Sequence, residues 1–66
     1  MSHLVNNRLA TMYNAIQTGA KDARVGHDMD ASRYGARDGS AWSSWYRWGY
    51  DGLPFPQELK DAGFVQ

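Results

Sequence analysis

Cationic and aromatic side chains are interleaved between residues 21 and 50, and this mixture is the sequence feature with the clearest chemical use. In RNA recognition, guanidinium groups pair with phosphates while flat rings stack on unpaired bases. At protein interfaces, Trp, Tyr and Arg contribute most of the binding energy. The candidate binding residues for RNA or a protein partner are Lys21, Arg24, Arg33, Arg37, Trp45, Tyr46, Arg47 and Trp48.

A second cluster, His27-Asp28-Met29-Asp30 with Ser32, has the alternating oxygen atoms of a calcium-binding loop. Such a loop needs a glycine at its sixth position and a bidentate glutamate at its twelfth. Counted from Asp28, these positions hold Arg33 and Gly39. We therefore predict a solvated turn, whose aspartates cap neighbouring backbone, and no metal site.

Catalytic groups are present without the spacing that catalysis requires. Ser40, Ser43 and Ser44 could act as nucleophiles only beside an oriented histidine, and nothing in the positions of the two histidines selects one of them. The chain also lacks a glycine-rich phosphate loop with lysine and a pair of carboxylates on an apolar wall. We expect neither enzymatic activity nor a cofactor.

Length, charge and composition limit the remaining possibilities. A chain of 66 residues forms one domain, which buries about 60% of its unfolded surface. Seven basic and seven acidic side chains cancel, but residues 1–50 hold six basic against four acidic groups, and residues 51–66 hold one against three. A neutral total argues against indiscriminate nucleic-acid binding. The absence of cysteine and of a long apolar run favours a cytoplasmic protein without membrane contact.

The first 25 residues have the apolar period of an amphipathic helix, which we place at about Leu4 to Val25. Ser2 or Asn6 could cap its start, and Gly26 could end it. A glycine inside such a helix lowers its stability by roughly 1 kcal/mol relative to alanine. The presence of Gly19 therefore indicates that a neighbouring element approaches the helix closely at this position. The predicted buried stripe contains Leu4 or Val5, Leu9, Met12, Tyr13, Ile16, Ala20 and Ala23.

A second helix is expected at Ala41 to Tyr50, where five aromatic rings fall within nine positions. Ser40 is its expected cap. So many rings exceed what a short chain can bury, so some should be exposed as a binding face. One face of this helix carries Trp42, Trp45 and Gly49, and an adjacent face carries Tyr46 and Tyr50.

The segment between the helices, residues 26–39, is predicted to be a connector. Asp30 could cap a single turn through Tyr34, which would place Arg33 and Arg37 together on a solvent-facing side. Tyr34 is the expected anchor of this loop in the core.

A short helix at about Pro56 to Ala62 should follow, with Phe55, Leu59 and Phe64 facing inward. The predicted fold class is all-α, with two principal helices joined by a long ordered loop and a short C-terminal helix in a single domain.

The order of these residues resembles the ribosome modulation factor family, as a diverged member. The resemblance covers about residues 13–50, and it is carried by Gly19-Ala20-Lys21-Asp22-Ala23-Arg24-Val25-Gly26, Tyr34 and Tyr46-Arg47-Trp48-Gly49-Tyr50. It implies a two-helix core and a small cytoplasmic protein that binds the small ribosomal subunit through its RNA and modulates translation. The acidic tail at residues 51–66 has no counterpart in the motif.

This chain departs from the family pattern at several positions. Ser32-Arg33 replaces the usual Asn-Pro before the loop tyrosine, Asp22 replaces a small residue, and the chain is neutral where ribosome-binding members are basic. An alternative function is therefore a protein-binding inhibitor or adaptor that uses the aromatic helix, for example a phage- or plasmid-type product acting on a host protein.

Overall fold

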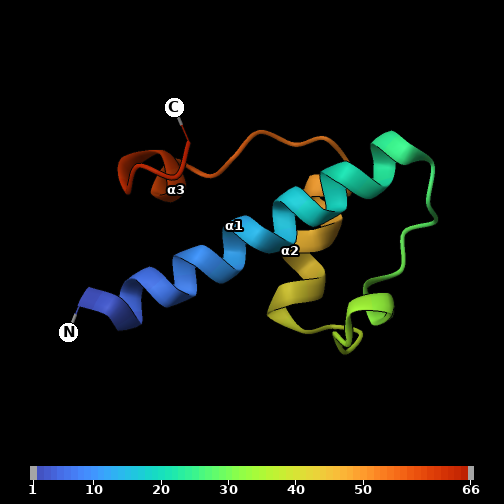
Figure 1. The fold of residues 1–66 in the computed structure, drawn as a ribbon, viewed down its shortest axis with the longest axis horizontal. Helices are drawn as coiled ribbons and strands as arrows, with labels where there is room; N and C mark the ends of the chain where they lie inside the picture. The colour runs from blue at the N-terminus through green and yellow to red at the C-terminus, as the bar shows by residue number, and fades with distance from the viewer. Residues whose placement is uncertain (1, 66) are drawn as a thin grey trace.

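The computed structural model describes the backbone of residues 2–65 and the side chains of residues 8–65. It contains α1 (Ser2–Val25), the short 3₁₀ helix η1 (Ala31–Tyr34), α2 (Ala41–Tyr50) and α3 (Gln57–Asp61), without a strand in residues 2–65. Figure 1 shows α1 crossing α2, with the loop at one end of the crossing and α3 on the other side of α1. The predicted all-α class, with two principal helices and a short third one, is confirmed.

The predicted helix boundaries agree with the structure to within two residues. Helix α1 begins at Ser2 rather than Leu4, and α3 spans Gln57–Asp61 rather than Pro56 to Ala62. Gly26 ends α1 because its φ of 83° leaves the right-handed region. Ser40 caps α2 as expected, accepting a hydrogen bond from the Ser43 N–H at 3.1 Å. The proposed N-caps, Ser2 and Asn6, both lie within α1, so Asn6 does not cap its start, because a cap precedes the first helical residue. The side chains of Leu4 and Val5 lie outside the described residues.

The two principal helices meet through a pair of glycines. A Cβ atom on Gly19 would come within 1.9 Å of the Tyr46 carbonyl oxygen, and one on Gly49 within 1.9 Å of the Ile16 carbonyl oxygen. Each glycine therefore lies directly against the backbone of the opposite helix, where no side chain fits. The close approach predicted at Gly19 is present, and Gly49 is its reciprocal partner on α2.

A compact apolar core lies beside this crossing. Leu9, Met12 and Ile16 on α1 are buried together with Leu59 of α3. Phe55 and Phe64 close the cluster by packing on Tyr13, with ring centroids 5.5 and 5.4 Å apart. The inward orientation predicted for Phe55, Leu59 and Phe64 is thus confirmed, and it holds the C-terminal segment against α1.

The buried stripe of α1 differs from the predicted one toward its C-terminal end. Ala23 is exposed, whereas Ala15 and Asp22 are buried. The reason is the crossing at Gly19: the face that meets α2 continues by three residues from Gly19 to Asp22. A carboxylate therefore occupies a core-facing position.

A bulky residue at Gly19 should force the helices apart. The substitution Gly19→Leu is expected to destabilise the fold by about 1 to 3 kcal/mol, because overpacking displaces backbone that has no room to move. Gly49→Leu should behave in the same way. Urea unfolding measures both effects, with Ala23→Leu as the control because Ala23 is exposed on the same helix. Equal stability of the Gly19 and Ala23 variants would contradict this packing.

Candidate functional site

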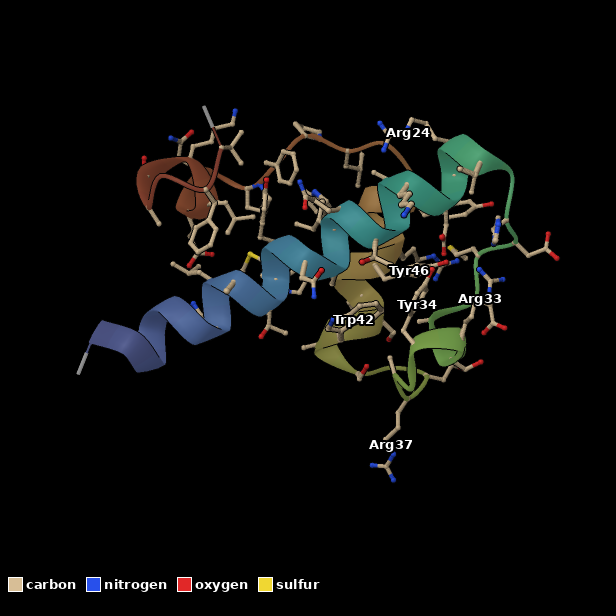
Figure 2. All side chains as sticks on the ribbon, viewed as in Figure 1. Arg24, Arg33, Tyr34, Arg37, Trp42 and Tyr46 are labelled. Carbon is tan, nitrogen blue, oxygen red and sulfur yellow. The ribbon has the colours of Figure 1, made fainter. Side chains whose placement is uncertain are left out.

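The carboxylate of Asp22 is the centre of a buried polar cluster, and Figure 2 labels the three residues that contact it, Arg33, Tyr34 and Tyr46. Only 4% of Asp22 is exposed. Its oxygens accept hydrogen bonds from the Tyr46 hydroxyl at 2.7 Å, from the Tyr34 hydroxyl at 2.7 and 2.8 Å, and from the Arg33 guanidinium at 3.2 Å. One side chain of α1 therefore joins η1 and α2.

The cluster fixes the protonation of its members. Hydrogen bonds from Tyr46 and Tyr34, together with the charge of Arg33, hold the pKa of Asp22 below its ordinary value, although burial opposes them. Burial and the neighbouring Asp22 carboxylate raise the pKa of Tyr46. At neutral pH, Asp22 is therefore charged and Tyr46 keeps its proton to donate.

Further hydrogen bonds tie the loop to this cluster. The Tyr46 hydroxyl accepts the Asp30 N–H at 3.2 Å, and Arg33 donates to the Asp28 carbonyl at 3.2 Å. Tyr50 donates to the His27 carbonyl at 2.7 Å. Asp30 caps η1 through the Ser32 N–H at 3.1 Å, as the sequence indicates. The long connector is therefore held by polar contacts rather than by apolar burial.

Two predicted binding residues belong to the fold instead. Tyr46 is 1% exposed, so it lies in the core and has almost no accessible surface to offer a partner. Arg33 stays exposed, as Arg37 does, but its guanidinium is paired with Asp22 at 3.2 Å rather than free for a partner. Tyr34 anchors the loop, but through its hydroxyl, since the residue stays 45% exposed beside Trp42.

The role of Asp22 is not among the predictions from the sequence, where this position only departs from the family pattern. The available signal was its place three residues after Gly19, on the face that a glycine crossing buries. A lone acid on such a face needs hydrogen-bond donors, and the tyrosines and arginine of the following segments supply them.

Four of the predicted binding cations remain at the surface. Lys21, Arg24, Arg37 and Arg47 are all exposed, and none has a salt bridge or side-chain hydrogen bond within residues 8–65. Lys21 and Arg24 are neighbours on α1 at a three-residue spacing. Figure 2 places Arg24 and Arg37 on opposite sides of the molecule, so these two cations do not share one face.

The tryptophans of α2 are partly buried. Trp45 and Trp48 pack edge to face with centroids 5.4 Å apart and contact the apolar core. Trp48 also donates to the Pro54 carbonyl at 2.7 Å, which fixes the chain after α2. Both rings thus support the fold, and their remaining exposed area is available to a partner.

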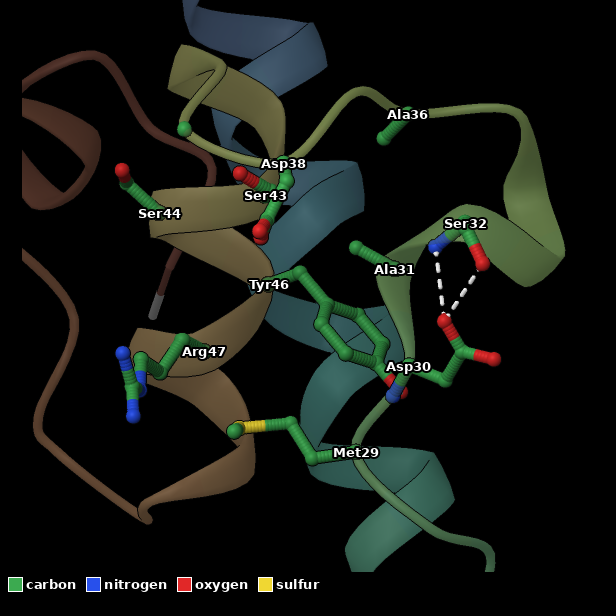
Figure 3. Close-up of a pocket in the computed structure, with 11 residues that line it drawn as sticks. Met29, Asp30, Ala31, Ser32, Ala36, Asp38, Ser43, Ser44, Tyr46 and Arg47 are labelled. Carbon is green, nitrogen blue, oxygen red and sulfur yellow. Dashed lines mark hydrogen bonds between the residues drawn. The ribbon is translucent and has the colours of Figure 1, made fainter.

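A pocket of about 710 Å³ opens between the loop and α2 (Figure 3). The loop contributes Met29, Asp30 and Asp38, and α2 contributes Arg47. The rest of the wall is made by small or hydroxylated residues and by Tyr46, namely Ala31, Ser32, Ala36, Gly39, Ser43, Ser44 and Tyr46.

A second groove, of about 410 Å³, lies where α1, α2 and α3 meet. Trp42 and Trp45 line it from α2, and the ion pair between Arg8 and Glu58 lies at its edge with a 3.2 Å separation. Thr11, Met12 and Ala41 complete the lining. This groove is the more aromatic of the two.

Comparison with protein families, with curated proteins and with solved structures finds no match. Of the helices in the described part of the chain, none has the length and apolar character needed to cross a membrane.

Removing the Tyr46 hydroxyl should be costly. Tyr46→Phe deprives the Asp22 carboxylate of a donor and the Asp30 N–H of an acceptor, so we expect a loss of about 1.5 to 3 kcal/mol in urea unfolding. The matched control is Tyr13→Phe, whose hydroxyl only accepts an exposed bond from Gln17. Similar losses in the two variants would show that the cluster does not stabilise the fold.

Acid should release the cluster. The pKa of Asp22 is lower in the folded chain than its ordinary value of 3.8. The contribution of ionised Asp22 to the free energy of unfolding is therefore complete above pH 3.8, and it is lost as the pH falls through the lower pKa of the folded chain. The stability of Asp22→Asn should therefore depend less on pH than that of the wild type between about pH 5 and about pH 2. Asp51→Asn, at an exposed position, serves as the control. Parallel pH profiles for all three proteins would refute the assignment.

Proposed function

We propose that this chain is a small non-catalytic protein of the cytoplasm that associates with the small ribosomal subunit and modulates translation by binding ribosomal RNA. The observation that carries the proposal is the set of exposed cations without a protein partner in the described part of the chain: Lys21, Arg24, Arg37 and Arg47. Cations that the fold does not use are free to neutralise phosphates.

The helix crossing supports the same proposal. Gly19 and Gly49 belong to the two segments on which the resemblance to the ribosome modulation factor family rests, and each is required by the backbone of the opposite helix. The resemblance therefore includes both glycines that the close contact between α1 and α2 requires. Arg33, by contrast, belongs to the Asp22 cluster and is left out of the proposed RNA contacts.

Neutralising the free cations in pairs tests this function. Sedimentation with ribosomal subunits should weaken for Lys21→Gln with Arg24→Gln, and also for Arg37→Gln with Arg47→Gln. The slope of log affinity against log salt is negative. If each cation contacts one phosphate, each double substitution should reduce the magnitude of this slope by about 1.4 to 1.8. Lys60→Gln on α3 is the control, since it removes an exposed cation from the acidic tail.

Two outcomes would overturn the proposal. The first is a wild-type protein that does not sediment with small subunits at low salt. The second is an association that both double variants retain with the wild-type salt slope, because the free cations would then have no part in it.

The second groove favours a different function, a protein-binding inhibitor or adaptor. Its exposed indole area beside the Arg8–Glu58 pair suits an amphipathic segment of a host protein with one apolar anchor and charges of both signs. Such an interaction should depend less on salt than RNA binding. It should also be weakened by Trp45→Ala, provided circular dichroism shows that this variant folds, while neutralising Lys21 and Arg24 should leave it unchanged.

A further inference from the structure

The pocket between the loop and α2 contains opposite charges that do not meet each other. Asp38 and Arg47 both line it, yet they form no ion pair, and neither has another side-chain partner within residues 8–65. Figure 3 shows Asp38 at one end of the pocket, Met29 at the other and Arg47 along α2. An occupant that satisfies both charges must offer hydrogen-bond donors at one end and an anion at the other.

The other polar side chains that line the pocket already have hydrogen-bond partners. Asp30 accepts the N–H and the hydroxyl of Ser32 on one carboxylate oxygen, Oδ1. The hydroxyls of Ser43 and Ser44 donate to the Ser40 carbonyl at 2.9 and 3.2 Å. Asp38 is thus the carboxylate with both oxygens free to accept from an occupant.

We propose that this pocket binds an unpaired guanine nucleotide, with RNA as its source. The RNA source rests on the proposed function, whereas recognition of the nucleotide rests on the pocket alone. In this assignment Asp38 binds the base at one end of the pocket, Arg47 pairs with the phosphate, and Met29, at the end opposite Asp38, packs against the ribose.

The choice of guanine follows from hydrogen-bonding patterns. A carboxylate can accept two parallel bonds, and guanine presents two adjacent donors, N1–H and the N2 amino group, on its Watson–Crick edge. Adenine and cytosine place an acceptor beside their amino donor, and uracil flanks its single donor with carbonyl oxygens. Each of these would bring an oxygen or nitrogen lone pair against the Asp38 carboxylate, which is unfavourable in a partly enclosed site.

The remaining walls suit the body of a nucleotide. Small-molecule sites commonly have volumes of about 300 to 1,000 Å³, and the volume of this pocket, about 710 Å³, falls within that range. Met29 is 42% exposed at the pocket wall, where its flexible side chain can pack against the ribose. Ala31 and Ala36 leave room beside it.

Titration of the isotope-labelled protein with 5′-GMP and 5′-AMP, followed by NMR, tests this assignment. We expect GMP to shift resonances of pocket residues and to bind at least about tenfold more tightly than AMP, as a bidentate contact discriminates between bases. Asp38→Asn should remove this preference. Arg47→Gln should weaken GMP binding while leaving guanosine binding, which involves no phosphate, unchanged.

The controls are Asp51→Asn and Lys60→Gln, which remove exposed charges outside the pocket. Both should bind GMP as the wild type does, and circular dichroism should show that all variants keep their helices. Equal affinity for GMP and AMP, or an unchanged preference in Asp38→Asn, would overturn the assignment. The absence of any GMP-dependent shift would also overturn it.

Short single-stranded oligonucleotides separate RNA from a free nucleotide as the source. UUGU should bind more tightly than UUAU, whereas binding of GMP without binding of UUGU would overturn the RNA source. Sedimentation with ribosomes separates the two proposals: wild-type association without GMP binding removes the pocket assignment alone. GMP binding without ribosome association removes the proposed function alone.

Discussion

The arrangement of the loop depends on one buried carboxylate. Asp22 is 4% exposed and is satisfied by donors from Tyr46, Tyr34 and Arg33. Breaking a buried charged network by removing one member is costly, because the groups left behind lose their partners. The charge of Asp22 therefore specifies where η1 lies relative to α1 and α2, in a loop whose own helix buries no residue.

The glycine crossing makes this cluster possible. Because Gly19 and Gly49 let the two backbones touch, Tyr46 lies close enough to α1 for its hydroxyl to reach Asp22. Packing and polar contacts are thus coupled at one end of the crossing, while the apolar core with Leu59 lies at the other. Arg33, Tyr34 and Tyr46 stabilise the fold, and the functions proposed above rest on the surface cations and on the two pockets beside α2.

Much of the fold could be predicted from the sequence because it follows local rules. The 3.6-residue period, the Ser40 and Asp30 caps and the terminating Gly26 define elements that the structure reproduces. Tertiary pairing was harder to predict. The pairing of Arg33 and the burial of Tyr46 depend on an acid three residues beyond Gly19, so a binding face read from residue types alone included side chains that the core needs. The pocket was not predicted, since the path of the loop across α2 is set by the same long-range contacts.

The central claim is that the Asp22 carboxylate holds the loop, and hydrogen exchange of the Asp30 amide tests it most directly. That N–H donates to Tyr46, whose hydroxyl is positioned by Asp22. In Asp22→Asn under conditions where both proteins are folded, the Asp30 amide should exchange much faster than in the wild type, while amides of α1 near Ile16 change far less. Unchanged protection of the Asp30 amide in this variant would contradict the account.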